Sequence, residues 1–263
     1  MKKKMNTNRI IGLAACLLIT LILVAFVAQE KKVTKHIAGT GGKGFAVLEL
    51  FTSEGCSSCP PADELMATIQ KESQGQPIYI LAYHVDYWNN QGWKDIFSSP
   101  EYSQRQVQYG QWLGSPQIYT PQLIINGTEQ YVGSDESNIR GAIHDQLTDG
   151  SVSMLTLKAH QDNKGLSVQY QVGNVVKGSS LLIAIVQKAA QSKVERGENA
   201  GHTLFHVQIV RALKNEAIRA SGSGNMTVSL PKGFDEQGWE VIGLIQDQGS
   251  GQILGVTKAE LSK

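Results

Sequence analysis

The chain has 263 residues, of which 41% are hydrophobic and 18% charged, and its formal net charge is +1. This composition is typical of a globular protein and excludes an intrinsically disordered chain. Four of the basic residues lie within the first nine positions, so the remainder carries 20 basic and 23 acidic residues and offers no electrostatic basis for binding nucleic acid.

Residues 1–28 have the pattern of a signal sequence or a single membrane anchor. The stretch 10–28 is almost entirely apolar and follows a basic N-terminus. Cys16 ends a Leu-Ala-Ala-Cys sequence that resembles a lipoprotein box, but the apolar run continues well past it. We expect an uncleaved anchor or a late cleavage, with the body of the protein in the cell envelope outside the cytoplasm. The polar segment 29–43 is expected to be a flexible tether.

A strand, a turn, a Cys-x-x-Cys motif and a helix follow the tether. Residues 45–51 form an apolar run with the length of a buried strand, and turn residues then lead to Cys56 and Cys59. Pro60 and Pro61 come next, and because proline is tolerated in the first turn of a helix they place the helix start beside Cys59. A residue before proline avoids helical angles, so the regular helix is expected to begin at Pro61.

This position favours redox chemistry at the two cysteines. The free N–H groups and the dipole at a helix start stabilise a thiolate relative to a thiol. We expect Cys56 to be the exposed nucleophile and Cys59 the resolving thiol, in a thiol–disulfide oxidoreductase acting on protein thiols and disulfides of the envelope. A half zinc site and a static structural disulfide are the alternatives. The third cysteine, Cys16, lies in the apolar segment and gives no second pair of zinc ligands.

A second buried strand is predicted at residues 78–83, which makes a right-handed βαβ unit with the first strand and the helix. His84 ends this strand at the edge where α/β sheets place ligands. It is a candidate for proton transfer to the departing sulfur or for metal binding. Cys56, Cys59 and His84 together would suit copper, so a copper-binding or copper-delivery module is the alternative function. A hydrogen-bonded histidine that organises the next loop is the other interpretation.

Residues 85–114 hold three of the four tryptophans. Asn89, Asn90 and Gly92 mark a loop, and a helix is expected from Pro100 to about residue 113, capped by Ser99. The aromatic residues are expected to form a small core of this insertion, or to wall a substrate groove beside Cys56, with Trp88 as the candidate for that wall.

Thr120 and Pro121 precede a third apolar strand at residues 122–125. A cis Thr120–Pro121 bond would turn the backbone of Thr120 towards the dithiol, so both residues are candidates for aligning an extended peptide substrate. The Asn126-Gly127 pair then predicts a hairpin, and a helix at residues 136–147 is expected to start at Ser134 or Asp135 and to end near residue 150.

After residue 150 the pattern changes to short strands separated by turns. Seven runs with strand character predict an antiparallel β-sandwich domain at 151–263, after a first domain at 44–150; they are residues 154–159, 166–172, 181–187, 204–212, 226–230, 241–247 and 253–258. His202 and His206 are interpreted as a surface pair, since four strand residues span about 13 Å and cannot share one metal ion. Residues 196–199 lie in a long polar loop that is expected to be a solvated connection, with a loop that reaches the first domain as the alternative.

Several of these motifs together resemble a known family. The sequences are F-T-S-E-G-C-S-S-C-P-P-A-D, H-V-D-Y-W-N-N-Q-G-W-K-D-I-F, R-Q-V-Q-Y, Y-T-P-Q and R-G-E-N-A-G-H-T-L. They are similar to a bacterial family of secreted thioredoxin-like proteins that is named only as a domain of unknown function. The resemblance implies a thioredoxin-like fold with an appended β domain, Cys56 and Cys59 as the redox pair and Pro121 as a cis-proline. Gly55 stands where thioredoxin has tryptophan, and Ser57 and Ser58 separate the cysteines. The resemblance therefore does not predict the reduction potential of the pair.

Overall fold

The computed structural model describes residues 43–162 and 165–262. The predicted membrane segment 10–28, Cys16 and nearly all of the predicted tether lie outside these residues. No helix within the described part is long and apolar enough to cross a membrane. The elements are, in chain order, β1 (Ala46–Thr52), α2 (Pro60–Glu72), β2 (Ile78–His84), the 3-10 helix η1 (Tyr87–Gln91), α3 (Pro100–Trp112), β3 (Gln122–Ile125), β4 (Glu129–Val132), α4 (Glu136–Thr148), β5 (Leu155–Asp162), β6 (Gly165–Val172), β7 (Ser179–Lys193), β8 (Thr203–Ala217), β9 (Ser223–Val228), β10 (Trp239–Asp247), β11 (Ile253–Lys258) and β12 (Glu260–Ser262).

The protein is a mixed α/β structure with one large sheet and one smaller sheet. The large sheet has eight strands in the order β11-β10-β7-β8-β2-β1-β3-β4, and the smaller one has the order β12-β5-β6-β9. Strand β1 pairs in parallel with β2 across the predicted βαβ crossover through α2, and antiparallel with β3. This register places Thr52 beside His84, so the loops that follow β1 and β2 start at the same edge of the sheet.

The helix starts follow local sequence rules, with one correction. Ser99 accepts a hydrogen bond from the backbone N–H of Glu101, and Asp135 accepts one from that of Asn138, which confirms both predicted caps. Helix α2 begins at Pro60, and Cys59 already has helical angles of φ −80° and ψ −36°, so the expected start at Pro61 is wrong. The Cys59 carbonyl accepts hydrogen bonds from two successive backbone N–H groups of the first turn, which outweighs the preference against helical angles before proline.

The predicted hairpin and the predicted cis bond are both present. The Thr120–Pro121 peptide bond is cis. Asn126 and Gly127 have φ values of 46° and 73°, as the turn between β3 and β4 requires. The Asn126 side chain also accepts a 2.7 Å hydrogen bond from the backbone N–H of Val47, which ties this turn to the start of β1.

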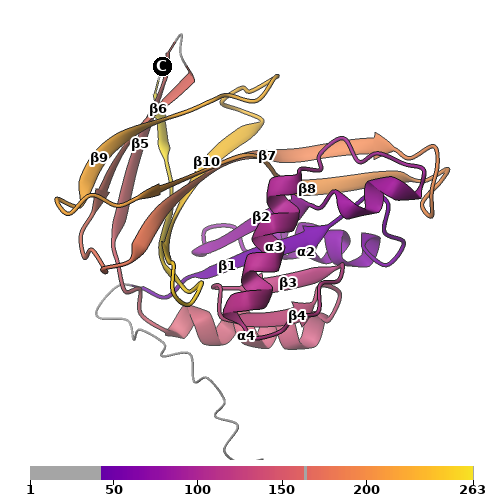
Figure 1. Ribbon diagram of the computed structural model, residues 1–263, viewed down its shortest axis with the longest axis horizontal. Coiled ribbons are helices and arrows are strands. Elements are labelled where there is room, and N and C mark those ends of the chain that lie inside the picture. Colours follow the sequence, from indigo (N-terminus) through magenta and orange to yellow (C-terminus); the bar gives the residue numbers. More distant parts are fainter. Residues whose placement is uncertain (1–42, 163–164, 263) are drawn as a thin grey trace, which may run out of the picture. The chain divides into compact units, whose positions relative to one another are not determined.

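The strands predicted after residue 150 are present, but they divide between the two sheets. Strands β7, β8, β10 and β11 extend the large sheet, and β8 joins it to β2 through the parallel pair Ala82 and Ile209. Residues on both sides of the predicted boundary therefore share one sheet. The first eight residues of β7, Ser179–Val186, are all buried, as in a strand that is covered on both faces. Figure 1 shows β7 and β8 continuing past β10 towards the loops that follow β1 and β2.

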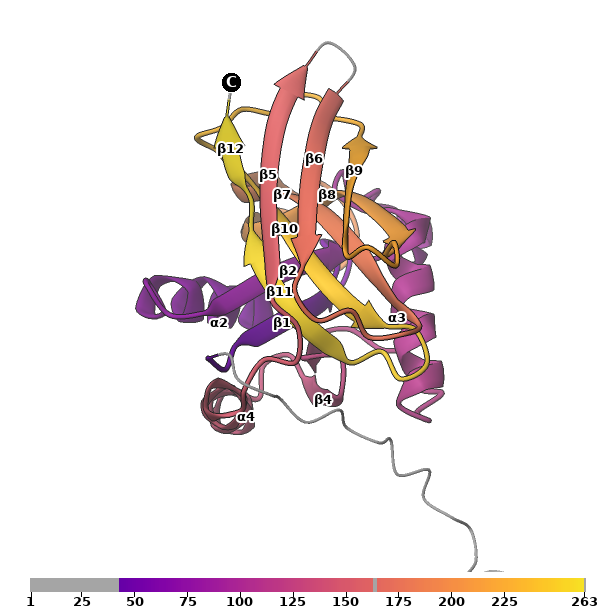
Figure 2. The same ribbon diagram turned by 90° about the vertical axis from the view of Figure 1, so that its left-hand side faces the viewer.

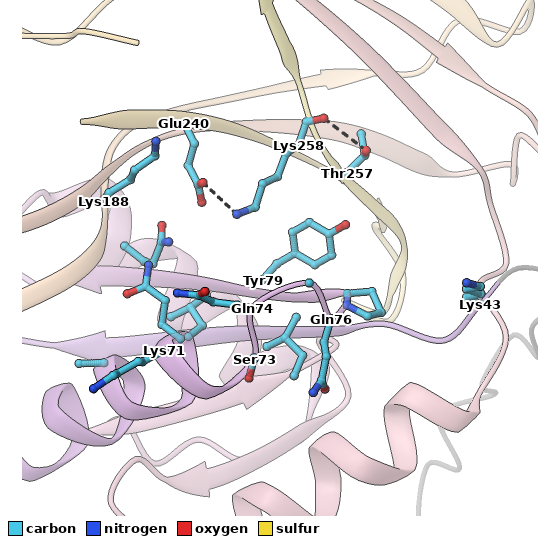
Figure 3. A pocket seen from close by; sticks show the side chains of 17 residues that line it. Lys43, Lys71, Ser73, Gln74, Gln76, Tyr79, Lys188, Glu240, Thr257 and Lys258 are labelled. Atoms are coloured by element: carbon cyan, nitrogen blue, oxygen red, sulfur yellow. Dashed lines mark hydrogen bonds and ion pairs between the residues drawn. The ribbon is translucent and has the colours of Figure 1, made fainter. Parts of the chain in front are cut away.

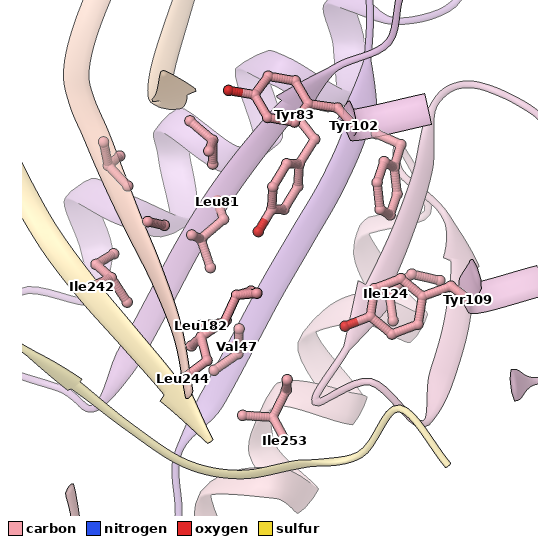
Figure 4. Packing of buried hydrophobic residues seen from close by; sticks show 14 of the residues in the cluster. Val47, Leu81, Tyr83, Tyr102, Tyr109, Ile124, Leu182, Ile242, Leu244 and Ile253 are labelled. Carbon is pink, nitrogen blue, oxygen red and sulfur yellow. The ribbon is translucent and has the colours of Figure 1, made fainter. Parts of the chain in front are cut away.

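Three hydrophobic clusters hold the layers together. One lies between α2, α4 and the face of β1–β3 that they cover, and another lies between the two sheets. Figure 2 shows the four-stranded sheet as a separate layer in front of the large one. The third cluster joins side chains from both halves of the described chain, including Val47 and Leu81 with Leu182, Leu244 and Ile253 (Figure 4). Tyr102 and Tyr109 of α3 also belong to it, so the expected separate aromatic core of residues 85–114 is wrong.

A buried polar network fixes α3 to the large sheet. Arg105 donates three hydrogen bonds to the Glu49 carboxylate at 2.7–3.0 Å, and a fourth to the Gln246 side chain at 3.1 Å. The Tyr109 hydroxyl joins the same network through Glu49, Arg105 and Gln246. The charge of Glu49 is therefore balanced inside the core, by a residue of α3 that is also bound to β10.

Candidate functional site

The two cysteines lie between the end of β1 and the first turn of α2. Their Sγ atoms are at disulfide-bonding distance, and both residues have an exposed fraction of 0%. The Sγ atom of Cys56 lies 3.8 Å from the backbone carbonyl oxygen of Thr120 and 3.9 Å from the Ser58 hydroxyl. The residue before the cis-proline is thus next to the dithiol, although 64 positions separate it from Cys56.

Cys56 is fully buried, so the expectation of an exposed nucleophile is wrong, and the turn between β7 and β8 is bound to the backbone beside it. The side-chain amide of Asn199 donates hydrogen bonds to the backbone carbonyls of Glu54 at 2.9 Å and of Cys56 at 3.0 Å. Glu198 accepts a 3.0 Å hydrogen bond from the backbone N–H of Ser57. We call residues 194–202 the covering turn.

Residues 196–198 are exposed, as expected for a solvated connection, but Asn199 is not. Asn199 is only 4% exposed, and Gly197 lies against Gln91 and Trp93 of the loop that follows β2. The position of the covering turn depends on the length of β7 and β8, which have 15 residues each. The loop therefore reaches the first predicted domain, which is the alternative for residues 196–199, and the strands that carry it are longer than the predicted runs 181–187 and 204–212.

Trp88 lies where a wall of the site was predicted. Its indole N–H donates a 2.8 Å hydrogen bond to the Thr120 hydroxyl. The Cβ atom of Trp88 lies 3.1 Å from the position that a Cβ on Gly55 would take, so a larger residue before Cys56 would press on the tryptophan. Trp88 therefore packs closely against Gly55, the residue just before Cys56.

His84 is fully buried and is held by a carboxylate. Its Nδ1 atom lies 2.7 Å from Asp95, which also accepts hydrogen bonds from the backbone N–H groups of Glu54 and Phe97. Burial acts to raise the pKa of Asp95, but His84 and these N–H groups outweigh it and lower that pKa. The described residues contain no cluster of three His, Cys, Asp or Glu side chains that could hold a metal ion.

A histidine that the sequence analysis placed on the surface lies in the core of this site. His202 is exposed, but His206 is 2% exposed and its ring centroid is 4.8 Å from that of His84. Its Nε2 atom lies 3.6 Å from Glu54 and its Nδ1 atom 3.7 Å from Asp63. Burial acts to lower the pKa of His206, but the two carboxylates outweigh it and raise that pKa to about 9.

Comparison with known proteins supplies the family. The profile of a family described as a protein of unknown function, DUF1223, matches residues 47–246. The chain belongs to the DUF1223 family. The match covers β1 through most of β10, and so includes the dithiol, the Thr120–Pro121 bond and the covering turn.

Two solved structures are similar to this DUF1223 protein. Protein AGR_C_4864 from Agrobacterium tumefaciens has 26% sequence identity and a TM-score of 0.60, over 84% of this chain and 96% of that one. HBP35 of Porphyromonas gingivalis has 16% identity and a TM-score of 0.60, over 86% of this chain and 77% of that one, and this likeness concerns the fold alone. No curated protein matches the chain.

Two hollows lie outside the dithiol itself. A polar pocket of about 910 Å³ is found at the far end of α2, and Tyr79, Gln74 and the ion pair of Glu240 with Lys258 are among its lining residues (Figure 3). None of the residues that line it belongs to the dithiol site of the DUF1223 protein. A shallower hollow of about 550 Å³ includes Tyr119, which directly precedes Thr120 in the chain; its other lining residues are Ser115, Gln117, Gln130, Tyr131, Val132 and Asp135.

Proposed function

We propose that this DUF1223 protein is an extracytoplasmic thiol–disulfide oxidoreductase that acts on protein thiols and disulfides of the cell envelope. The observation that carries the proposal is the position of Cys56 and Cys59. Their sulfur atoms are at disulfide-bonding distance at the start of α2, and the Thr120 carbonyl lies 3.8 Å from Cys56. A helix start favours the thiolate form of a reduced pair, which is the reactive form in thiol–disulfide exchange.

We infer a thioredoxin-like arrangement for residues 44–150. It is supported by the parallel β1-α2-β2 unit, by the hairpin of β3 and β4 with α4 after it, and by the strand order β2-β1-β3-β4. The packing of β5, β6 and β9 on one face of β7 and β10 supports a sandwich-like layer as the appended β part. The dithiol then lies at the edge where parallel strands end, which is the usual place for a ligand in α/β sheets.

The chemistry is a two-step exchange. The Cys56 thiolate attacks a substrate disulfide, so a mixed disulfide forms and one substrate sulfur leaves as a thiolate. The Cys59 thiol then loses its proton and attacks Cys56, which breaks the mixed disulfide and releases the second substrate thiolate. The substrate gains two electrons and the Cys56–Cys59 pair loses them. In the opposite direction the same steps oxidise a substrate dithiol.

The peptide substrate is expected to lie along the Thr120–Pro121 segment. The backbone of Thr120 faces Cys56, and its side chain is held by the indole of Trp88. The hollow that Tyr119, Tyr131 and Val132 line together with four polar residues offers both apolar and polar side chains to a partner. The envelope location rests on the apolar sequence at residues 10–28.

Insulin reduction and oxidation of a dithiol peptide test the proposal. The wild-type protein is expected to be active, and Cys56→Ser to be inactive. Cys59→Ser is expected to accumulate a mixed disulfide with the substrate, because the resolving thiol is lost. Cys16→Ser is the control and should keep full activity. Equal activity of the wild-type protein and Cys56→Ser would reject the function.

A further inference from the structure

Two carboxylates and one imidazole are buried together beside the dithiol. Glu54, Asp63 and His206 have exposed fractions of 0%, 6% and 2%. Glu54 accepts a 2.7 Å hydrogen bond from the Trp93 indole and another hydrogen bond from the Ser192 hydroxyl, while Asp63 accepts one from Thr52 at 3.2 Å. The ring nitrogens of His206 have no hydrogen-bond partner within the described residues and face the two carboxylates at 3.6 and 3.7 Å.

Both carboxylates belong to residues that are close to a cysteine in the sequence. Asp63 follows Cys59 by four residues in α2, so the two side chains lie on the same face of the helix, one turn apart. Glu54 precedes Cys56 by two residues, and Asn199 binds the backbone carbonyls of both. Glu54 and Asp63 thus lie within a few residues of the cysteines and are buried with them, and a charge in such low-dielectric surroundings is screened less than in water.

The charges in this cluster have opposite effects on a thiolate. A nearby carboxylate disfavours a second negative charge, whereas a nearby imidazolium favours it. His206 is charged at neutral pH, because the two carboxylates raise its pKa to about 9 despite its burial. The other charged or titratable groups around it are His84 on β2, Asp95 beyond that ring, and Arg211, which lies over the Phe97 ring next to His206.

We propose that His206 is a positioning residue of the dithiol, which as a buried imidazolium between Glu54 and Asp63 offsets their charges and so favours the thiolate form of the reduced pair. The positive charge comes from β8, more than 140 residues after the cysteines in the chain, and it reaches them on the same hairpin that carries the covering turn. His206 takes no part in the two exchange steps themselves, so its role is confined to the ionisation of the thiols.

This inference rests on the proposed function for its biological meaning, but its test measures thiol ionisation and needs no substrate. The thiolate absorbance of the reduced full-length protein is followed against pH in a Cys16→Ser background, so that only Cys56 and Cys59 report. His206→Gln is expected to move the midpoint of thiolate formation up by about one pH unit, which is ~10-fold less thiolate at neutral pH. His202→Gln, on the exposed part of the same hairpin, should leave the midpoint unchanged.

A second variant gives a shift of opposite sign. Asp63→Asn removes a negative charge from the cluster, so it is expected to lower the midpoint, while Glu64→Gln on the exposed side of α2 should not move it. A merely structural role for His206 would change the access of reagents to Cys56 but would not give opposite shifts for His206→Gln and Asp63→Asn. If His206→Gln does not fold, the titration of the His206 ring in the wild-type protein decides the matter.

The wild-type protein offers a further measurement. Coupling between two sites is reciprocal, so a His206 that favours the thiolate must itself hold its proton more tightly when the thiolate is present. The NMR titration of the His206 ring is therefore expected to have a higher midpoint in the reduced protein than in the oxidised protein. Equal midpoints in the two states, or an unchanged thiolate midpoint in both variants, would overturn the inference. Absence of insulin reduction would instead count against the proposed function.

Discussion

The side-chain amide of Asn199 lies 3.0 Å from the carbonyl oxygen of Cys56, although 143 residues separate the two in the chain. The same amide binds the carbonyl of Glu54 at 2.9 Å. The covering turn is thus hydrogen-bonded to the backbone at Glu54 and Cys56. Both cysteines are fully buried. We therefore expect a protein disulfide to reach Cys56 more readily when the covering turn moves away from this backbone.

Asn199→Ala is expected to make the dithiol more accessible. The change removes two hydrogen bonds from the buried end of the covering turn, each worth ~1 kcal/mol. Alkylation of reduced Cys56 by iodoacetamide should become several-fold faster, and the free energy of unfolding should fall by about 1–3 kcal/mol. Asn215→Ala, in the exposed part of β8, is the matched control and should change neither quantity. An unchanged alkylation rate in Asn199→Ala would mean that the turn does not limit access.

Trp88→Phe tests how Thr120 is held beside Cys56. Phenylalanine keeps most of the ring packing but cannot donate the 2.8 Å hydrogen bond to the Thr120 hydroxyl. If the proposed function is correct, kcat/KM for insulin reduction should fall by about 3–10-fold, as expected for one lost hydrogen bond. Trp112→Phe removes a comparable hydrogen bond, to the Gln248 carbonyl at the end of α3, and should leave the activity unchanged. Equal losses in both variants would point to a general effect on folding.

Arg105→Met is expected to be strongly destabilising. The guanidinium balances Glu49 inside the core, and its loss leaves that carboxylate buried without a charged partner. Removing one partner of such a pair costs about 3–5 kcal/mol, measured as the free energy of urea unfolding. Arg140→Met is the control, because the Arg140 side chain is 41% exposed in its ion pairs with Glu72 and Glu136 and is expected to contribute less than about 1 kcal/mol. Similar losses in the two variants would contradict the role assigned to the buried network.

The features that the sequence predicted correctly depend on neighbours in the chain. The helix cap at Ser99 and the turn at Asn126 and Gly127 follow from the local rules for caps and hairpins. The first two strands and the helix between them follow from hydrophobic spacing in the same way. The place of the cysteines before α2 therefore needed no knowledge of the rest of the chain.

The features that the sequence did not predict depend on pairing between distant strands. The cover over Cys56 and the buried position of His206 both require β8 to lie beside β2, and a single residue pair, Ala82 with Ile209, records that contact. Alternation along β8 did carry a hint, because residues two apart in a strand share a face and Leu204 and Gln208 are buried like His206. Because histidine is polar, His206 was not recognised as part of the buried face of this strand.

The pH dependence of stability is expected to show the buried position of His206. A histidine whose pKa is about 9 in the folded protein and about 6.5 when unfolded stabilises the fold fully below pH ~6.5. This contribution is lost as the pH rises through the folded pKa, and a difference of this size corresponds to roughly 3 kcal/mol. Urea unfolding of the oxidised protein between pH 6.5 and 9.5 should therefore show a falling midpoint. In His206→Gln the midpoint should fall less with pH, because glutamine does not bind a proton in either state. His202→Gln should show the same fall as the wild-type protein. A fall of equal size in His206→Gln would assign the pH dependence to other groups.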